Sequence, residues 1–118
     1  MTAAQVPGED TAAAAAPVAC SLSRAGLAEQ ADRWERLAAG AMTGRKKTGH
    51  GIRVTFRPGP GTEAELRVLV DVESRCCPWA AWTVHADGTR LVLDVRSAGD
   101  GVAALHALFT GLRAAPVP

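Results

Sequence analysis

The sequence predicts an α+β fold, in which a small antiparallel or mixed sheet of three strands has helices packed on one face. Three segments, "GIRVTF", "WTVHA" and "RLVLDV", alternate apolar and polar residues, which is the pattern of half-buried strands. Apolar residues recur at helical spacing in three other segments, so the expected order is helix, strand, helix, strand, strand, helix. A chain of 118 residues suits one domain of this kind.

The first helix is expected to begin at Ser23, because serine commonly caps helix N-termini, and to end before Gly44. Leu22 and Leu27 have the spacing of a hydrophobic staple around that start. The apolar stripe of this helix comprises Leu27, Ala31, Trp34, Leu37, Ala38 and Ala41.

The first strand follows a glycine-flanked basic segment. Residues 44–51, "GRKKTGHG", are expected to form a solvated loop. The strand would then point Ile52, Val54 and Phe56 toward the core, and "RPGPG" would end it. Between the last two strands, Asp87-Gly88 is typical of a tight hairpin turn. The core-facing residues of that hairpin would be Trp82, Val84, Leu91, Leu93 and Val95.

The second helix is predicted by Thr62 and Glu65, which have the spacing of a capping box, and it should extend to about Arg75. Its buried stripe would contain Leu66, Leu69 and Val70. The last helix is expected from about Asp100. Its buried face would comprise Val102, Leu105, Leu108, Phe109 and Leu112.

Charge and hydropathy exclude several classes of partner. The net charge of +1, with both signs interspersed, gives no electrostatic footprint for nucleic acid or an anionic membrane. No run of about 18 apolar residues predicts a transmembrane helix. Residues 1–19 lack the basic start of a signal peptide, so we expect a disordered leader, a single domain over residues 20–115, and a cytoplasmic protein. In that compartment the three cysteines would be thiols or metal ligands rather than a structural disulfide.

The stretch "ESRCCPW" concentrates the candidate chemistry. Glu73 continues the apolar stripe of the second helix, and an acid is costly to bury unless something uses it. Extending the stripe by three and four residues reaches Cys76 and Cys77, while Pro78 disfavours helical geometry at Cys77. We therefore expect Glu73 and at least one thiol to share a pocket at the helix end. The negative end of the helix disfavours a thiolate there, and a bound soft metal ion would offset this.

The leading hypothesis is a soft metal ion, bound as the cofactor by the thiolates of Cys20, Cys76 and Cys77. Thiolates select soft ions such as Cu(I), Zn(II), Hg(II) or trivalent arsenic. His85 or His106 could add a ligand, and the absence of CxxC spacing argues against structural zinc. Shared ligation through sulfur–metal bonds of about 2.3 Å requires sulfur–sulfur distances of about 3.5–4 Å. Cys20 would lie near the cysteine pair if the first two helices run antiparallel.

Two alternatives come from other functional classes. In a small thiol-dependent enzyme, Cys77 or its neighbour would attack or capture a substrate, and Glu73 would donate or accept the proton. In a non-catalytic interaction module, the cysteines would be incidental. The expected partner is a metal or a small thiol-reactive ligand, with neither nucleic acid nor membrane. The sequence leaves the oligomeric state open, a homodimer included.

The layout of Cys20, an amphipathic helix, Glu73 and then Cys76-Cys77-Pro78 resembles a group of small actinobacterial proteins with a "CCPF"-type motif. The resemblance covers most of residues 20–113 in layout, and Trp79 stands here in place of the phenylalanine. Because that group occurs beside regulators of the mercury-resistance type, the resemblance implies thiol or heavy-metal chemistry, such as detoxification or metal handling. In its inventory of thiols and one acid the chain is also similar to organomercurial lyases, with no match along the whole chain.

Overall fold

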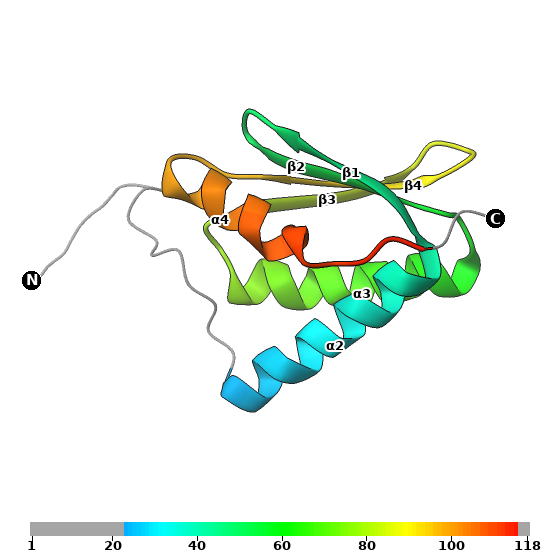
Figure 1. Cartoon of the computed structure of the whole chain (residues 1–118), viewed down its shortest axis with the longest axis horizontal. Helices are drawn as coiled ribbons and strands as arrows, with labels where there is room; N and C mark the ends of the chain where they lie inside the picture. Colours follow the sequence, from blue (N-terminus) through cyan, green and yellow to red (C-terminus); the bar gives the residue numbers. More distant parts are fainter. Residues whose placement is uncertain (1–22, 116–118) are drawn as a thin grey trace, which may run out of the picture.

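The structure is a computed structural model that describes residues 23–115, and its fold is α+β, as the sequence predicts (Figure 1). The expected leader over residues 1–19 lies outside this range. The elements in chain order are α2 (Arg24–Ala41), β1 (Met42–Thr48), β2 (Gly51–Phe56), α3 (Pro60–Cys76), β3 (Ala81–Ala86), β4 (Leu91–Arg96) and α4 (Asp100–Thr110). None of these helices combines the length and the apolarity that crossing a membrane requires.

The two faces of the sheet differ: one is open, and the other is covered by helices. Across residues 23–115 it has four strands in the order β1-β2-β4-β3, and each neighbouring pair is antiparallel. β2 and β3 therefore run parallel to each other on either side of β4, and α3 connects them. All three helices lie on the same side of the sheet (Figure 1). The pocket described below lies within this helical layer.

The fourth strand corrects the three-stranded prediction, because the segment expected as a basic loop forms most of β1. β1 pairs along its length with β2, from Met42 opposite Phe56 to Thr48 opposite Gly51. Because β1 is rich in charged and polar residues, no alternation of apolar residues marks it as a strand in the sequence. Charged side chains are nevertheless characteristic of an edge strand, where they discourage pairing with other chains. Arg45 on this strand also donates from Nη1 to the carbonyl oxygens of Phe109, at 2.6 Å, and of Leu112. The edge strand thus holds the C-terminal end of α4.

The helix boundaries confirm one predicted cap and correct another. Ser23 is the N-cap of α2, and its Oγ accepts a hydrogen bond from Gly26 N at 3.1 Å. The capping box predicted at Thr62 and Glu65 is wrong, because α3 begins at Pro60 with Gly59 as its N-cap. Proline fits the first turn of a helix, where its missing N–H would have no helical partner, so α3 starts three residues earlier than the motif suggests.

The core lies between the sheet and the three helices. Ile52, Val54 and Phe56 of β2 are buried as predicted, together with Leu91, Leu93 and Val95 of β4. Trp82 and Val84 of β3 are half-buried against them. Leu27 and Leu108 depart from the prediction: 45% and 48% of their surfaces are exposed, although both continue apolar stripes. They line a pocket between α2 and α4 instead of packing in the core.

Candidate functional site

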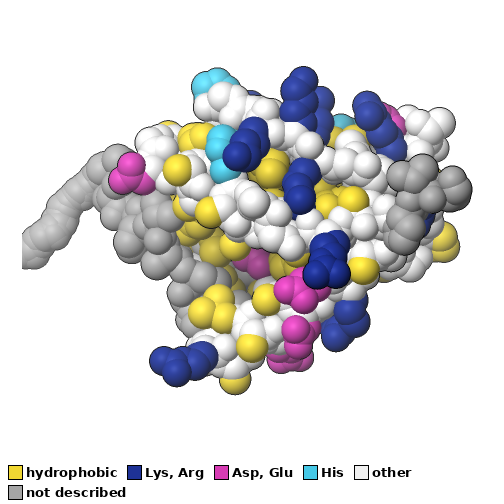
Figure 2. Space-filling model, viewed as in Figure 1, with side chains coloured by type: hydrophobic (Ala, Val, Ile, Leu, Met, Phe, Trp, Pro, Cys, Tyr) yellow, Lys and Arg dark blue, Asp and Glu magenta, His cyan; other side chains and the backbone are white. Residues whose placement is uncertain are grey.

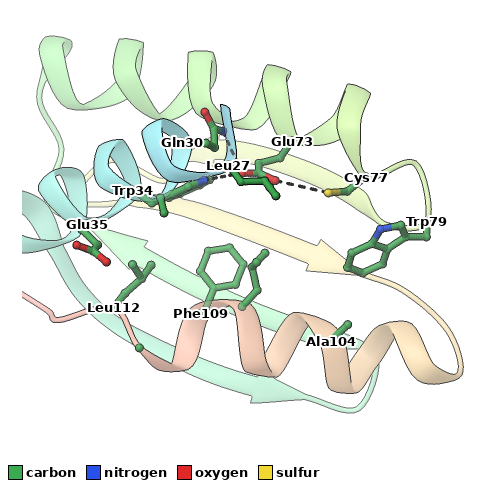
Figure 3. A pocket seen from close by; sticks show the side chains of 13 residues that line it. Leu27, Gln30, Trp34, Glu35, Glu73, Cys77, Trp79, Ala104, Phe109 and Leu112 are labelled. Carbon is green, nitrogen blue, oxygen red and sulfur yellow. Dashed lines mark hydrogen bonds between the residues drawn. The ribbon is translucent and has the colours of Figure 1, made fainter. Parts of the chain in front are cut away.

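A pocket of about 520 Å³ opens between α2, the C-terminal end of α3 and α4 (Figure 3). Trp34 of α2 and Phe109 of α4 meet edge to face in its wall, with ring centroids 5.5 Å apart and planes at 83°. Hydrophobic side chains gather in the hollow between α2 and α4 on this face of the molecule (Figure 2). The pocket is therefore largely apolar, as most small-molecule sites are.

Glu73 supplies the buried carboxyl group of this pocket, with only 6% of its surface exposed. Its Oε2 accepts hydrogen bonds from Gln30 Nε2 and from Trp34 Nε1, each at 2.9 Å. Its Oε1 accepts one from Cys77 Sγ at 3.6 Å (Figure 3). A buried carboxylate is tolerated when donors replace the water it has lost, and here three donors do so.

The backbone of α3 explains why Cys77 reaches Glu73. The two residues are four positions apart, which places their side chains on one face of the helix. Cys77 is the C-cap of α3, and its backbone N donates to Glu73 O at 2.7 Å. Its side chain is 3% exposed, at the end of the pocket that Trp79 also lines. Pro78 follows directly, so the helix ends where the thiol enters the pocket.

The other wall of the site comes from α2, which runs antiparallel to α3. Gln30 donates to Leu69 O, at 3.2 Å, and to Glu73. Arg33 lies one turn after Gln30 on α2 and contacts Glu65, which lies two turns before Glu73 on α3. Arg33 donates to both carboxylate oxygens of Glu65, at 2.8 and 3.1 Å. This hydrogen-bonded ion pair lowers the pKa of Glu65 and raises that of Arg33. It ties α2 to α3 outside the pocket.

Of the predicted site residues between 23 and 115, the structure brings Glu73 and Cys77 together in the pocket, which the others do not line. Cys76 is partly buried but does not line the pocket. His85 lies in a shallow depression on the open face of the sheet, and His106 Nε2 is 2.7 Å from Gly51 O. Between residues 23 and 115, no three His, Cys, Asp or Glu side chains are grouped closely enough to hold a metal ion. Cys20 lies outside the described residues, so its predicted proximity stays a prediction.

Gln30 and Trp34, which hold the carboxylate, were not among the predicted site residues. A signal for Gln30 was present, because it lies three residues after Leu27 and four before Trp34, on the apolar stripe of the first helix. Gln30 and Glu73 are thus polar residues on the buried faces of two helices. Two such residues are expected to become partners when the helices pack, since neither can remain buried without one.

The end wall of the pocket depends on close packing around the start of α4. Ser97 Oγ donates to Trp79 O at 2.7 Å, which fixes the backbone beside Cys77. A Cβ atom added to Gly101 would lie 2.0 Å from Ser97 Oγ and 3.3 Å from Trp79 Cε3. Only glycine therefore permits this approach of α4 to Trp79.

Comparison of the chain with protein-family models, with curated proteins and with solved structures found no match. The class of site is defined by its geometry alone: an apolar pocket with one thiol, one carboxylate and two N–H donors at one end. A thiol beside a carboxylate can lose its proton to that carboxylate when the sulfur bonds to a metal or an electrophile.

Proposed function

We propose that the protein binds a soft metal or metalloid species through the thiolate of Cys77, in the pocket between α2 and α4. The observation that carries the proposal is the contact of Cys77 Sγ with Glu73 Oε1 at 3.6 Å, at the wall of an apolar cavity. A coordinating thiol gives up its proton, and Glu73 is the acceptor already in place. Cys76 and Cys20 are proposed as further ligands.

The chemistry of the donors supports a soft species over a hard one. Thiolate sulfur favours Cu(I), Hg(II), Zn(II) and trivalent arsenic, whereas Mg²⁺ and Ca²⁺ take sets of oxygen ligands. Glu73 offers a single carboxylate whose oxygens already accept three hydrogen bonds. The site therefore has one strong soft ligand and little capacity for a hard ion.

Titration of the reduced protein with Hg(II), As(III), Cu(I) and Zn(II) tests the proposal. Competition with a small chelating thiol gives the affinity of each ion. We expect Cys77→Ser to weaken the binding of at least one ion by tenfold or more, on the order of the losses that follow when a metal site is perturbed. Cys76→Ser and Cys20→Ser test the second and the third thiolate. If Cys77→Ser binds every ion as the wild type does, the proposal is wrong.

A second candidate, a small thiol-dependent enzyme, is favoured by the same contact between sulfur and carboxylate. Here Cys77 Sγ would attack a substrate carbon or heteroatom, and Glu73 Oε1 would take the thiol proton. The apolar walls would exclude water from the intermediate.

Turnover separates the two functions. We expect the protein to be saturated by one equivalent of a soft ion, and Glu73→Gln to retain that stoichiometry because the sulfur ligand remains. An enzyme would instead release product repeatedly from an activated aryl ester, and Glu73→Gln would lower its kcat by roughly 10²–10⁴-fold. Release of the phenolate, followed by absorbance with excess ester, is the measurement. Repeated release that depends on both Cys77 and Glu73 would favour the enzyme over the binding protein.

A further inference from the structure

We infer that the ligand of this site is an organic derivative of a soft metal or metalloid, whose apolar carbon group lies in the groove between α2 and α4. This inference rests on the proposed binding at Cys77 and names the class of species bound. It is drawn from the size of the pocket, the distribution of its polar groups and the exposure of two leucines at its sides.

The pocket is much larger than a bare ion requires. Its volume is about 520 Å³, whereas a water molecule occupies about 30 Å³ in the liquid. An ion at Cys77 with one or two waters would leave most of the space to face carbon. Pockets of roughly 300–1,000 Å³ with apolar walls are the ones that take organic molecules.

The buried polar groups of the pocket are collected at one end. Gln30, Glu73 and Cys77 converge there, on the side where α2 meets α3 (Figure 3). Glu35 of α2, an exposed side chain, lines the pocket near Leu112 at the opposite end (Figure 3). The walls between the two ends are carbon, from residues of α4 such as Leu108 and Phe109 and from Leu27 of α2. A ligand that fits both regions has a soft, charged atom at one end and an apolar group at the other.

Leu27 and Leu108 extend the apolar walls to solvent. They line the pocket from α2 and α4, and 45% and 48% of their surfaces are exposed. In residues 23–115 the one other large hydrophobic side chain with comparable exposure is Val68, on α3 and away from the pocket. Exposed apolar side chains that gather at a cavity, rather than singly, indicate a binding surface.

One thiolate is sufficient for a metal atom that is already bonded to carbon. With phenylmercuric acetate as the probe, the Hg–O bond to acetate breaks and the Hg–S bond to Cys77 forms. The Sγ–H proton passes to Glu73 Oε1, acetate leaves as the anion, and no oxidation state changes. The phenyl ring then extends from the sulfur into the groove, where its burial stabilises the complex.

The test compares phenylmercuric acetate with mercuric chloride, each in competition with glutathione. The variants are Leu108→Asn and, on the opposite wall, Leu27→Asn, with Val68→Asn as a control of almost equal exposure. We expect each pocket variant to weaken phenylmercury binding by roughly tenfold, the equivalent of losing part of the apolar contact. Binding of Hg(II) should be unchanged in both, and Val68→Asn should leave both ligands unaffected.

Several results would overturn the inference while leaving the proposed function standing. Equal losses for phenylmercury and Hg(II) would show that the leucines act on the fold or on the metal alone. Unchanged binding of both ligands would show that the groove takes no organic group. Wild-type protein that gained nothing for phenylmercury over methylmercury, relative to glutathione, would contradict it without any substitution. By contrast, a Cys77→Ser variant that binds both probes normally would refute the proposed function itself.

Discussion

At the scale of single residues, the burial of Glu73 depends on hydrogen bonds from its neighbours. Its carboxylate is buried, yet it accepts hydrogen bonds from Gln30, Trp34 and Cys77. A hydrogen bond to a charged group contributes roughly 1.5–3 kcal/mol, and leaving such a group without donors is costly. The same bonds orient one oxygen toward α2 and the other toward the sulfur of Cys77.

Gly101 offers a test of the packing that forms the end wall. Gly101→Ala should destabilise the protein by roughly 1–3 kcal/mol, the usual consequence of overpacking. The new Cβ would lie 2.0 Å from Ser97 Oγ and 2.8 Å from Ser97 Cβ, so the backbone around Ser97 must shift. Urea unfolding gives the change in free energy.

Gly61 is the matched control, because it is likewise the second residue of a helix and a Cβ atom there would meet nothing within 4 Å. Gly61→Ala should be neutral or stabilise the protein by up to about 1 kcal/mol, through the entropy of the unfolded chain. Equal effects of the two substitutions would show that helix propensity, rather than packing against Ser97, decides the outcome.

At the scale of elements, the position of α2 on α3 decides whether the pocket exists. Two polar contacts set that position: Gln30 with Glu73 inside the pocket, and Arg33 with Glu65 outside it. The outer pair is bidentate, so it restrains the relative orientation of the Arg33 and Glu65 side chains as well as the distance between them. About a third of each side chain is exposed, so solvent screens the pair and its contribution to stability is no more than about 1 kcal/mol.

The outer pair predicts a pH dependence of stability. The hydrogen bonds from Arg33 lower the pKa of Glu65 in the folded protein. The stabilisation is therefore fully present above the pKa of Glu65 in the unfolded chain, about 4.3. It is lost as the pH falls through the lower, folded-state pKa, because protonation then breaks the pair.

Urea unfolding of the wild type and Glu65→Gln between about pH 2.5 and 7 checks this linkage. The difference in unfolding free energy should be constant near neutrality and should shrink toward zero in acid. Glu63→Gln is a suitable control, because Glu63 bonds to Arg67 within α3 and does not join two helices. A difference that persists unchanged to the lowest pH, or grows there, would contradict the assigned role of the pair.

At the scale of the whole molecule, the sheet and the helical layer contain different features. The sheet supplies one buried face and carries the basic β1–β2 hairpin, while the helical layer contains the pocket (Figure 1). The antiparallel packing of α2 and α3 meets the condition under which Cys20 would approach the cysteine pair, since α2 begins at the end where α3 finishes. The three-thiolate site stays a prediction, and the Cys20→Ser titration addresses it.

Local chemistry was sufficient to predict several elements from the sequence. The Asp87-Gly88 turn, the Ser23 cap and the alternation of Ile52, Val54 and Phe56 each depend on residues close together in the chain, and the structure confirms all three. The pairing of Glu73 with a thiol was also within reach, because both lie on one turn of one helix. Periodicity reports such short-range relations directly.

Tertiary structure alone decided the remaining features. β1 is a strand because β2 offers a ladder of backbone partners, and its charged residues give no pattern of their own. Leu27 and Leu108 stay exposed because a stripe is buried only where a neighbouring helix lies close enough to cover it. Gln30 and Trp34 became partners of Glu73 through contacts between helices some forty residues apart in the chain. The sequence by itself therefore determined which residues could carry chemistry, and packing over long range determined which of them meet.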